Sequence, residues 1–526
     1  MRRRLNNGAA LWRGAGRPLT LMFAGLGLAM AAGQAPLSLA WLAFGALTLA
    51  MWQGSRITDW RHAAWIGWVF GSGYFTGTLF WIVEPFFVDP WRHGWMAPFA
   101  LFFMAGGLAL FWGVAFGVSV RFGRTPAQRA LNLAVSLAAA ELARSYVLTG
   151  FPWALIGYIW TDTPLAQIAA WVGPHGLTLI TLVAAVLPAG WSTRRGAFVG
   201  VGLAACVLAV PAGLGMWRLG QPEMPRADPV VVRLLQPNAP QHQKWDSQYI
   251  PQFLRAQMEM TSAPGAVDLI VWPETAVPYW LHQATDVFEA ISQAARGAPV
   301  IVGISRQDDD LRARNSMVVI GSAGQVTKLY DKHHLVPFGE YLPFAWVLNR
   351  VGLFGLAEAA GGYRAGPGAS VLDLGPVLGR ILPLICYEMI FPQDLRAAPV
   401  RADWILQITN DAWFGKLAGP QQHLAQARMR AIEQGLPVLR SANTGVSAII
   451  DAKGRIKGAL ALNTRGALDG AVPQALEPTV YVATGDAPAG LIILCGGAWA
   501  VARRRFPARW RGRRKPKPVD GLSGSD

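Results

Sequence analysis

The chain has 526 residues and a formal net charge of +16 at pH 7, and 52% of its residues are hydrophobic whereas 15% are charged. This composition is far from that of an average soluble protein, and the length exceeds that of one compact domain. The apolar residues are concentrated in the first 215 positions and in one stretch near the C-terminal end. The composition therefore excludes a soluble single-domain protein and predicts a membrane part and a water-exposed part.

Eight apolar stretches approach the length of about 20 residues that a helix needs to cross a bilayer. They are residues 17–33, 36–53, 62–84, 95–120, 128–148, 164–191, 197–215 and 484–502. The segment GQAP separates the first two, and a re-entrant turn or one longer, broken segment is the alternative reading there. We expect a transmembrane domain over 1–216 and a last transmembrane helix at 484–502.

Arginines mark the side of the membrane on which each loop lies, because basic residues of short loops stay in the cytoplasm. They occur before the first span, between spans two and three, four and five, and six and seven, and after the last span. Both termini, including the basic tail 503–526, are therefore expected in the cytoplasm. Residues 217–483 are expected in the periplasm of a bacterium, beyond its inner membrane.

The positive charge has a membrane explanation as well. Acidic and basic residues nearly balance within 217–483, so the excess lies in the flanks of the membrane spans. Nucleic-acid binding is therefore not expected, and the basic tail is interpreted as a topology anchor that also favours anionic lipid headgroups.

From residue 229 onward, short β-rich runs alternate with polar helical stretches. The runs are VVVRLL, DLIVW, PVIVGIS, SMVVIG, ILPLICY, WILQIT and LPVLRSA, and helices are expected near 246–262, 282–296 and 420–435. This alternation predicts one large layered α/β or α+β domain over 217–483.

Cysteine usage narrows the chemistry of this domain. Cys206 and Cys495 fall in predicted spans, which leaves Cys386 without an intramolecular disulfide partner in the outward domain. A buried, inert thiol is one interpretation. The other is a nucleophile, because the apolar run ILPLIC stops at Cys386 and is followed by Tyr387 and Glu388, which places the thiol at a strand end.

A thiol nucleophile needs a base and a cationic or hydrogen-bonding environment. Glu274 follows an apolar strand in VWPETAVP, and KLYDKHHLVPFGEYLP supplies Lys332 and Glu340. Each of these residues alone is more typical of a solvated surface group. Together with Cys386 they suggest a nucleophile, a base and an oxyanion stabiliser at the ends of three β-like runs.

The segments WPE, LYDKHHLVPFGEYLP and ICYEMIFP, in this order, resemble the Glu, Lys, Cys triad of the nitrilase superfamily. The further segments NDAWFG, SANTGVSAIID and TVYVATGD narrow the resemblance to the apolipoprotein N-acyltransferases. His175 is a departure from that pattern. The resemblance implies a membrane helical domain that carries a periplasmic αββα sandwich of nitrilase type.

The resemblance also implies roles for individual residues. Cys386 would be the nucleophile, Glu274 the general base and Lys332 the group that stabilises the tetrahedral intermediate, with Glu340 in support. Tyr387 and Glu388 would shape the pocket of the nucleophile. Trp245 would lie on a mobile arm near the lipid entry, although an ordinary exposed aromatic is its simpler interpretation.

The implied reaction is ping-pong acyl transfer. A phospholipid would donate a fatty acyl group to Cys386, and the resulting thioester would be attacked by the amino group of a diacylated apolipoprotein. No metal, nucleotide or other cofactor is required, because the thioester conserves the acyl-transfer potential. One alternative is a membrane-tethered amidase, in which water replaces the amine. Another is a transporter or receptor. The spans contain few charged residues, with Glu141 as the main exception, and this argues against an ion pathway.

Aromatic residues near the outward ends of spans five and six suggest where a lipid substrate would rest. We expect a lipid-facing floor there, with interfacial anchoring as the simpler alternative. The residues are Phe151, Trp153, Trp160 and Trp171.

Overall fold

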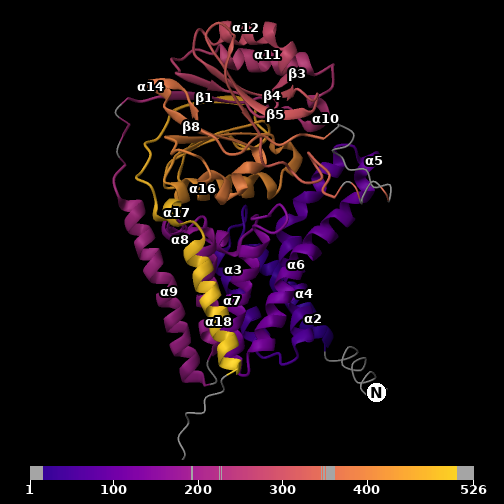
Figure 1. Cartoon of the computed structure of the whole chain (residues 1–526), viewed down its shortest axis with the longest axis vertical. Coiled ribbons are helices and arrows are strands. Elements are labelled where there is room, and N and C mark those ends of the chain that lie inside the picture. Colours follow the sequence, from indigo (N-terminus) through magenta and orange to yellow (C-terminus); the bar gives the residue numbers. More distant parts are fainter. Residues whose placement is uncertain are drawn as a thin grey trace, which may run out of the picture.

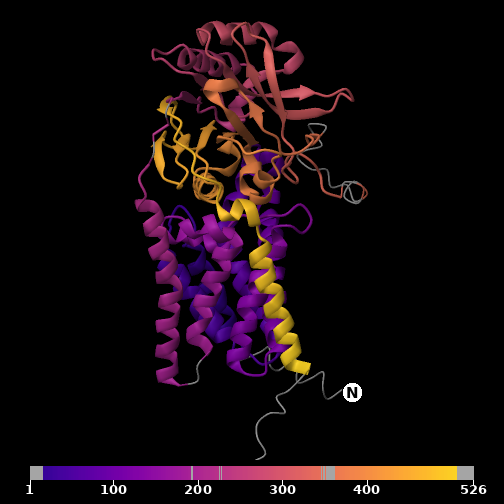
Figure 2. The ribbon, with the colours of Figure 1, turned by 60° about the vertical axis from the view of Figure 1, so that its left-hand side comes forward.

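The computed structural model describes residues 16–190, 193–223, 225–226, 228–344, 346, 350 and 362–505. A bundle of long helices carries a layered α/β domain on one of its ends (Figure 1). The upper domain is inserted between α9 (Arg194–Gly220) and α18 (Ala487–Arg505), which both run along the bundle in two views (Figure 2). Most of the predicted basic tail lies outside the described residues.

A helix forms in each of the eight apolar stretches, because continuous apolar sequence can satisfy its backbone polar groups only internally in a bilayer. Among the residues that the structure describes, four segments are long and apolar enough to cross a membrane: Trp60–Phe87, Pro90–Phe122, Pro164–Ala189 and Arg195–Gly220. The count of eight spans therefore stays a prediction. The helices are α2 (Gly16–Ala31), α3 (Ala40–Gly54), α4 (Trp60–Leu79), α6 (Ala97–Phe122), α7 (Pro126–Arg144), α8 (Ala169–Val186), α9 and α18.

Small residues let the helices of the bundle approach closely, as is common in membrane domains. A Cβ atom added at Gly27 of α2 would clash with the Phe70 carbonyl oxygen of α4, and one at Gly73 would lie 2.5 Å from the Ala24 carbonyl oxygen. Aromatic rings fill the space beside these crossings, where Tyr74 stacks on Trp112 with their centroids 5.0 Å apart.

A buried ion pair joins α7 to the loop that follows it. Both carboxylate oxygens of Glu141 accept from the Arg144 guanidinium, at 2.7 and 2.9 Å, and one also accepts from the Trp112 indole at 2.9 Å. The same guanidinium donates to the carbonyl oxygens of Phe151, Trp153 and Ala154. Arg144 is thus a buried residue whose charge is paired and whose hydrogen bonds hold the 151–154 loop.

The expected aromatic floor is different from a lipid-facing surface. Trp153 and Trp160 are fully buried, whereas Phe151 and Trp171 are partly buried. Trp153 packs against Trp81 and against Phe414 of the upper domain. Trp153 is interior because the upper domain covers it, whereas Trp160 packs against Trp41 and Phe44 within the bundle, and the local sequence could reveal neither contact.

The upper domain consists of two stacked sheets with helices on both outer faces, which is the expected αββα arrangement. One sheet has seven strands in the order β13-β1-β2-β4-β5-β6, with β3 beside β4, and the other has six in the order β12-β11-β10-β9-β8-β7. Their facing sides form a common apolar core. Helices α11 (Ile250–Thr261) and α12 (Thr285–Ala294) cover the first sheet, and α16 (Gly419–Gln434) covers the second.

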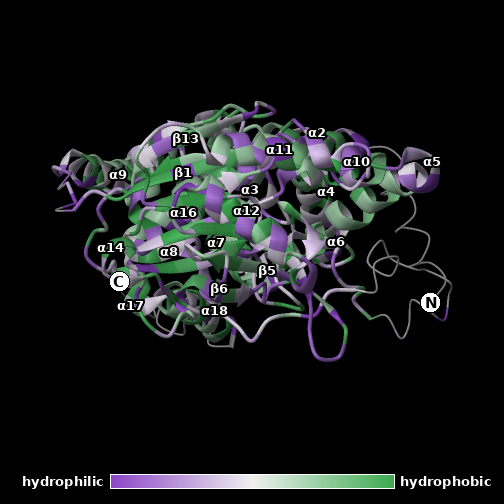
Figure 3. Cartoon of the chain, turned by 90° about the horizontal axis from the view of Figure 1, so that it is seen from above, coloured by the Kyte–Doolittle hydropathy of each residue, from purple (hydrophilic) through white to green (hydrophobic). Residues whose placement is uncertain are grey.

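The strands expected from apolar runs are all present, and they form the buried centre of both sheets. All of them except β5 have a parallel neighbour, and parallel strands are typically covered on two faces. Seen from above, these strands are the hydrophobic part of the domain and the loops around them are more hydrophilic (Figure 3). The strands are β1 (Val231–Gln236), β2 (Leu269–Val271), β4 (Val300–Gln307), β5 (Ala313–Ile320), β8 (Arg380–Ile385), β9 (Trp404–Thr409) and β10 (Val438–Ala442).

The strands that the sequence left unassigned are short or lie toward the sheet edges, and several are exposed, so that they lack a continuous apolar run. They are β3 (Val277–Trp280), β6 (Val326–Asp331), β7 (Leu372–Asp373), β11 (Ala448–Ile450), β12 (Ile456–Ala459) and β13 (Gly466–Ala471). Strand β6 matters most for the site, because it includes the start of the segment KLYDKHHLVPFGEYLP and ends directly before Lys332.

The apolar core of the helical bundle continues into the upper domain without a break. It includes Tyr387, Ile390 and Phe391, which follow strand β8, and Met429 and Ile432 of α16. Helix α16 therefore has two apolar faces, one against the second sheet and one against the bundle. The nucleophile candidate at the end of β8 is placed next to the membrane part by this contact.

Candidate active site

Three strand ends bring the candidate residues together from two different sheets. Glu274 lies three residues after β2, Lys332 follows β6 directly, and Cys386 follows β8 directly. The first two strands belong to the seven-stranded sheet and the third to the six-stranded sheet. The site therefore exists only because the sheets stack face to face.

Cys386 occupies a sharp turn between strand β8 and the short helix η9 (Cys386–Ile390). Its φ angle is 52°, in the left-handed region that non-glycine residues rarely adopt. The Cys386 carbonyl oxygen accepts a hydrogen bond from Gln407 Nε2 at 3.1 Å and lies 3.1 Å from His423 Nε2. The chain therefore turns away from the direction of β8 at Cys386, and side chains of the second sheet and of α16 contact the turn.

The Glu274 carboxylate is fixed at both oxygens. Oε1 accepts from Asn315 Nδ2 at 2.7 Å, and Oε2 accepts from the Asn410 backbone N–H at 2.8 Å. The Lys332 ammonium lies 3.8 Å from Oε1. The carboxylate is thus held by two hydrogen bonds beside a positive charge.

The Lys332 ammonium is buried, with its side chain 1% exposed, and is paired with acidic groups. Its Nζ lies 2.9 Å from Glu340 Oε1, and Asn315 donates to the same oxygen at 3.2 Å. Burial lowers the pKa of Lys332, but the charges of Glu340 and Glu274 outweigh it and hold that pKa above its usual value. Lys332 is therefore a positive charge in a site closed to water.

The Cys386 thiol experiences both of these charges. Burial, followed by the nearby Glu274 carboxylate, raises the pKa of the Cys386 thiol well above its usual value, and the Lys332 charge opposes this shift. The resting pair is therefore a protonated thiol beside an acceptor. The Cys386 sulfur can attack a carbonyl carbon only if its proton passes to the acceptor as the new bond forms.

Two family descriptions match the two parts of the chain. "Carbon-nitrogen hydrolase" matches residues 232–480, and "Apolipoprotein N-acyltransferase N-terminal domain" matches residues 26–187. An apolipoprotein N-acyltransferase from Rhodopseudomonas palustris is 38% identical over 466 residues, which cover 85% of this chain and 87% of that relative. One from Caulobacter vibrioides is 40% identical over 455 residues, covering 83% and 85%.

The chain belongs to the apolipoprotein N-acyltransferase family. It is therefore an acyltransferase with a nitrilase-like domain and apolar membrane helices. Among solved structures, an amidase of the nitrilase superfamily from Nesterenkonia aligns at 18% identity with a TM-score of 0.36, over 51% of this chain and 98% of that chain.

Within this N-acyltransferase fold, Glu388 is a buried connector. Its Oε1 accepts from the backbone N–H groups of His333 and His334, at 2.7 and 3.2 Å, and from the Tyr330 hydroxyl at 2.9 Å. Its Oε2 accepts from the Ile385 N–H at 2.7 Å. The carboxylate thus ties the turn of Cys386 to the segment that follows Lys332. Its neighbour Tyr387 packs edge-on against Phe391 and His334, beside the helical bundle.

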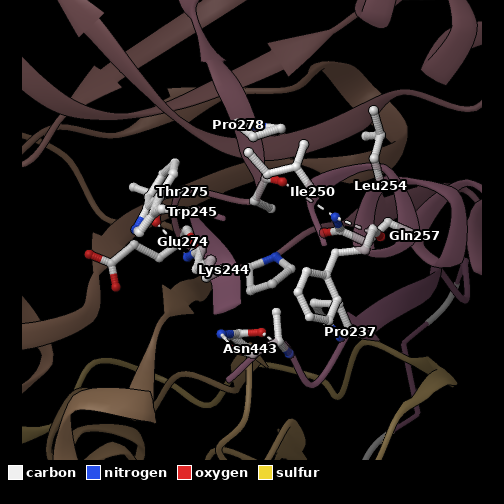
Figure 4. A pocket seen from close by; sticks show the side chains of 14 residues that line it. Pro237, Lys244, Trp245, Ile250, Leu254, Gln257, Glu274, Thr275, Pro278 and Asn443 are labelled. Carbon is white, nitrogen blue, oxygen red and sulfur yellow. Dashed lines mark hydrogen bonds between the residues drawn. The ribbon is translucent and has the colours of Figure 1, made fainter. Parts of the chain in front are cut away.

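Trp245 lines a small pocket that Glu274 also borders (Figure 4). Its side chain is 49% exposed, as the expected arm position allows. The preceding residue, Lys244, is buried and donates to the Glu274 carbonyl oxygen at 3.0 Å and to Thr275 Oγ1 at 2.7 Å. The Glu274 carboxylate points away from this pocket (Figure 4), so Lys244 holds the backbone of Glu274 while the acid faces Cys386.

Sequence reasoning missed the residues that orient the three candidates. Asn315 lies between Arg314 and Ser316 in the polar first half of β5, so no break in an apolar run identifies it. Asn410 acts on Glu274 through its backbone N–H, which leaves no trace in side-chain chemistry. Gln407 differs, because it is a buried polar residue within the apolar strand β9, and that interruption is a signal that could have identified it.

The pH dependence of stability offers a test of the Glu388 cluster. Burial opposes protonation of His333, but hydrogen bonds to Asp394 and Glu388 raise the pKa of its imidazole from 6.5 to about 10. A group whose pKa is higher in the folded than in the unfolded protein stabilises the fold. This stabilisation is fully present below the unfolded-state pKa and is lost as the pH rises through the folded-state pKa. We expect the melting temperature in detergent to contain a component that declines between pH 6.5 and about 10 and that His333→Gln removes.

The control is His282→Gln, because His282 is exposed. This variant should retain the wild-type slope of melting temperature against pH. An unchanged slope in His333→Gln would show that His333 is not protonated in the folded protein.

Proposed function

We propose that this chain transfers a fatty acyl group from a phospholipid, through a thioester on Cys386, to the N-terminal amino group of a diacylglyceryl-cysteine apolipoprotein. The observation that carries the proposal is the position of a protonated, buried thiol beside the fixed Glu274 carboxylate and the Lys332 ammonium. Membership in the apolipoprotein N-acyltransferase family supports the class of substrate.

In the first half-reaction, the Cys386 sulfur attacks the carbonyl carbon of a phospholipid ester while its proton passes to Glu274. Negative charge develops on the former carbonyl oxygen, and the buried Lys332 ammonium stabilises it. Collapse of the tetrahedral intermediate releases the lysophospholipid alkoxide, which takes the proton back from Glu274. The enzyme is left as a thioester, and Glu340 keeps Lys332 in place throughout.

In the second half-reaction, the apolipoprotein amine attacks the thioester carbonyl carbon. Glu274 accepts a proton from the attacking nitrogen, Lys332 again stabilises the oxyanion, and the thiol leaves with a proton from Glu274. An amide replaces the thioester, and the enzyme returns to its first state. Bond formation and cleavage balance without an external oxidant, metal or nucleotide.

The contact of the site with the helical bundle suits a lipid substrate. Because burial of each CH₂ group is favourable by about 0.8 kcal/mol, lifting a long acyl chain into water would cost on the order of 10 kcal/mol. Tyr387 and Phe391 belong to the same apolar core as the bundle. An acyl chain can thus approach Cys386 from the bilayer side without crossing water.

The proposal includes the topology expected from the sequence. Residues 1–216 would form the transmembrane domain, 217–483 the periplasmic catalytic domain, 484–502 the last transmembrane helix and 503–526 the cytoplasmic tail. The eight helices would all cross the bacterial inner membrane. Tyr387 and Glu388 would shape the pocket, and Trp245 would meet substrates at its entry.

We expect Cys386→Ser to lose acyl transfer from radiolabelled phospholipid to a diacylated peptide almost completely while the protein still folds, because a serine hydroxyl is a much weaker acid and nucleophile than a thiol. Intact-mass spectrometry should show a fatty acyl adduct on wild type and none on this variant. Cys206→Ala and Cys495→Ala serve as controls, since both thiols lie on bundle helices. Wild-type transfer by Cys386→Ser would refute the nucleophile assignment.

Glu274→Gln separates the base from the nucleophile. The amide keeps the size of the side chain but cannot accept the thiol proton, so thioester formation should slow by roughly 10²- to 10⁴-fold. Single-turnover measurement of the lysophospholipid released with the purified variant gives this rate. Asn315→Ala, which removes one hydrogen bond to Glu274, should slow the reaction less. Acyl-enzyme formation at the wild-type rate in Glu274→Gln would require another base.

Topology is tested with cysteines introduced into a Cys206→Ala, Cys495→Ala background. A membrane-impermeant thiol reagent applied to spheroplasts should label Asp309→Cys in the upper domain and miss Arg195→Cys at the start of α9. Both positions are exposed, so a difference reports on the side of the membrane. Labelling of Arg195→Cys alone would invert the topology and remove the periplasmic site.

A further inference from the structure

Two consecutive residues near the start of α16 face two different parts of the molecule. Gln422 is buried against the helical bundle. Its Oε1 accepts from the indole N–H groups of Trp153 and Trp81, at 2.7 and 3.2 Å. Its Nε2 donates to the carbonyl oxygens of Ala35 and Thr78, both at 3.1 Å. Every hydrogen-bonding position of this amide is therefore directed at the bundle.

The next residue, His423, is fully buried beneath the candidate nucleophile. Its Nε2 lies 3.1 Å from the Cys386 carbonyl oxygen and 3.0 Å from Gln407 Nε2. Its Nδ1 lies 3.0 Å from Asp411 Oδ1. The imidazole also packs against the Trp153 ring, with centroids 5.7 Å apart, so the bundle contacts both residues of the pair.

The surrounding groups select one protonation state for His423. Arg440 donates to Gln407 Oε1, so the amide nitrogen of Gln407 faces Cys386 and His423. One of its hydrogens is donated to the Cys386 carbonyl oxygen and the other to His423 Nε2. Nε2 is then an acceptor, and Nδ1 carries the hydrogen that is donated to Asp411 Oδ1, while Arg440 Nη2, 3.3 Å from Nδ1, donates to Asp411 Oδ2. Burial and the Arg440 charge lower the pKa of His423, consistent with a neutral ring.

We infer that Gln422 and His423 are positioning residues through which the helical bundle holds the turn of Cys386. The bundle binds Gln422 through the Trp153 indole, and the next residue, His423, accepts a hydrogen bond from Gln407. Gln407 in turn donates to the Cys386 carbonyl oxygen. The left-handed conformation of Cys386 makes this support necessary, because an unsupported turn would relax. The inference rests on the proposed nucleophilic role of Cys386, and it gives the membrane helices a part in catalysis beyond locating the lipid.

The test uses the full-length protein in detergent micelles with Cys206→Ala and Cys495→Ala, so that Cys386 is the one thiol. The rate at which iodoacetamide alkylates Cys386, measured across a range of pH, reports the geometry and acidity of the thiol without any lipid. Gln422→Leu removes the grip of the bundle. His423→Asn keeps a donor for Asp411 and loses the acceptor for Gln407, whereas His423→Gln offers that acceptor again.

We expect Gln422→Leu and His423→Asn to slow both alkylation and the kcat of acyl transfer by roughly 10- to 100-fold, because small displacements of a reacting group have effects of this size. The pH profile of alkylation should shift, the KM for phospholipid should stay near the wild-type value, and His423→Gln should recover part of the rate. Gln421→Leu is the matched control, since the Gln421 amide donates to the neighbouring Lys416 carbonyl oxygen, and it should behave as wild type.

Trp153→Phe provides a milder variant if Gln422→Leu does not fold, because it removes one hydrogen bond to Gln422 and keeps an aromatic ring. It should slow alkylation by a smaller factor. Wild-type alkylation and kcat in folded Gln422→Leu and His423→Asn, or in folded Trp153→Phe if those two do not fold, would overturn the inference. Loss of acyl transfer with unchanged alkylation would do the same. Because alkylation needs no acyl donor, failure of the proposed lipid chemistry would leave this measurement intact and be recognised separately.

Discussion

The site depends on the pairing of buried charges among Glu274, Lys332 and Glu340. A lysine ammonium whose side chain is 1% exposed is stable only beside compensating carboxylates. Lys332 meets this need at 2.9 Å from Glu340 and 3.8 Å from Glu274. The cluster cannot form unless the segments after β2 and β6 converge. Neutralising the buried Lys332 charge therefore requires the same arrangement of segments that brings the site residues together.

Buried connectors extend this arrangement to the nucleophile. The Glu388 carboxylate satisfies backbone N–H groups on both sides of the site, which joins the Cys386 turn to the segment after Lys332. Each such group, if left unpaired in the interior, would cost about 1–3 kcal/mol. Glu388 is therefore explained by structure, and the acid that faces the thiol is Glu274, whose charge acts on Cys386.

The membrane part is more than an anchor in this architecture. Its apolar core includes residues of η9, which begins at Cys386, and of α16. The Glu141 and Arg144 pair holds the loop that presents Trp153 to the upper domain. Because close-packed side chains cannot shift independently, a displacement of side chains in the bundle would also displace the upper-domain residues packed against them. The candidate site is thus built at the junction of two domains.

The sequence by itself determined the features that depend on local patterns. Long apolar runs became helices, apolar runs of strand length became the central strands, and the ends of those strands located Glu274 and Cys386. Only the tertiary structure decided which distant groups meet. Asn410 reaches Glu274 through a backbone N–H, and Trp153 is interior because α16 covers it. Such contacts join residues more than 100 positions apart, and they follow from sheet stacking and domain docking, which local periodicity does not encode.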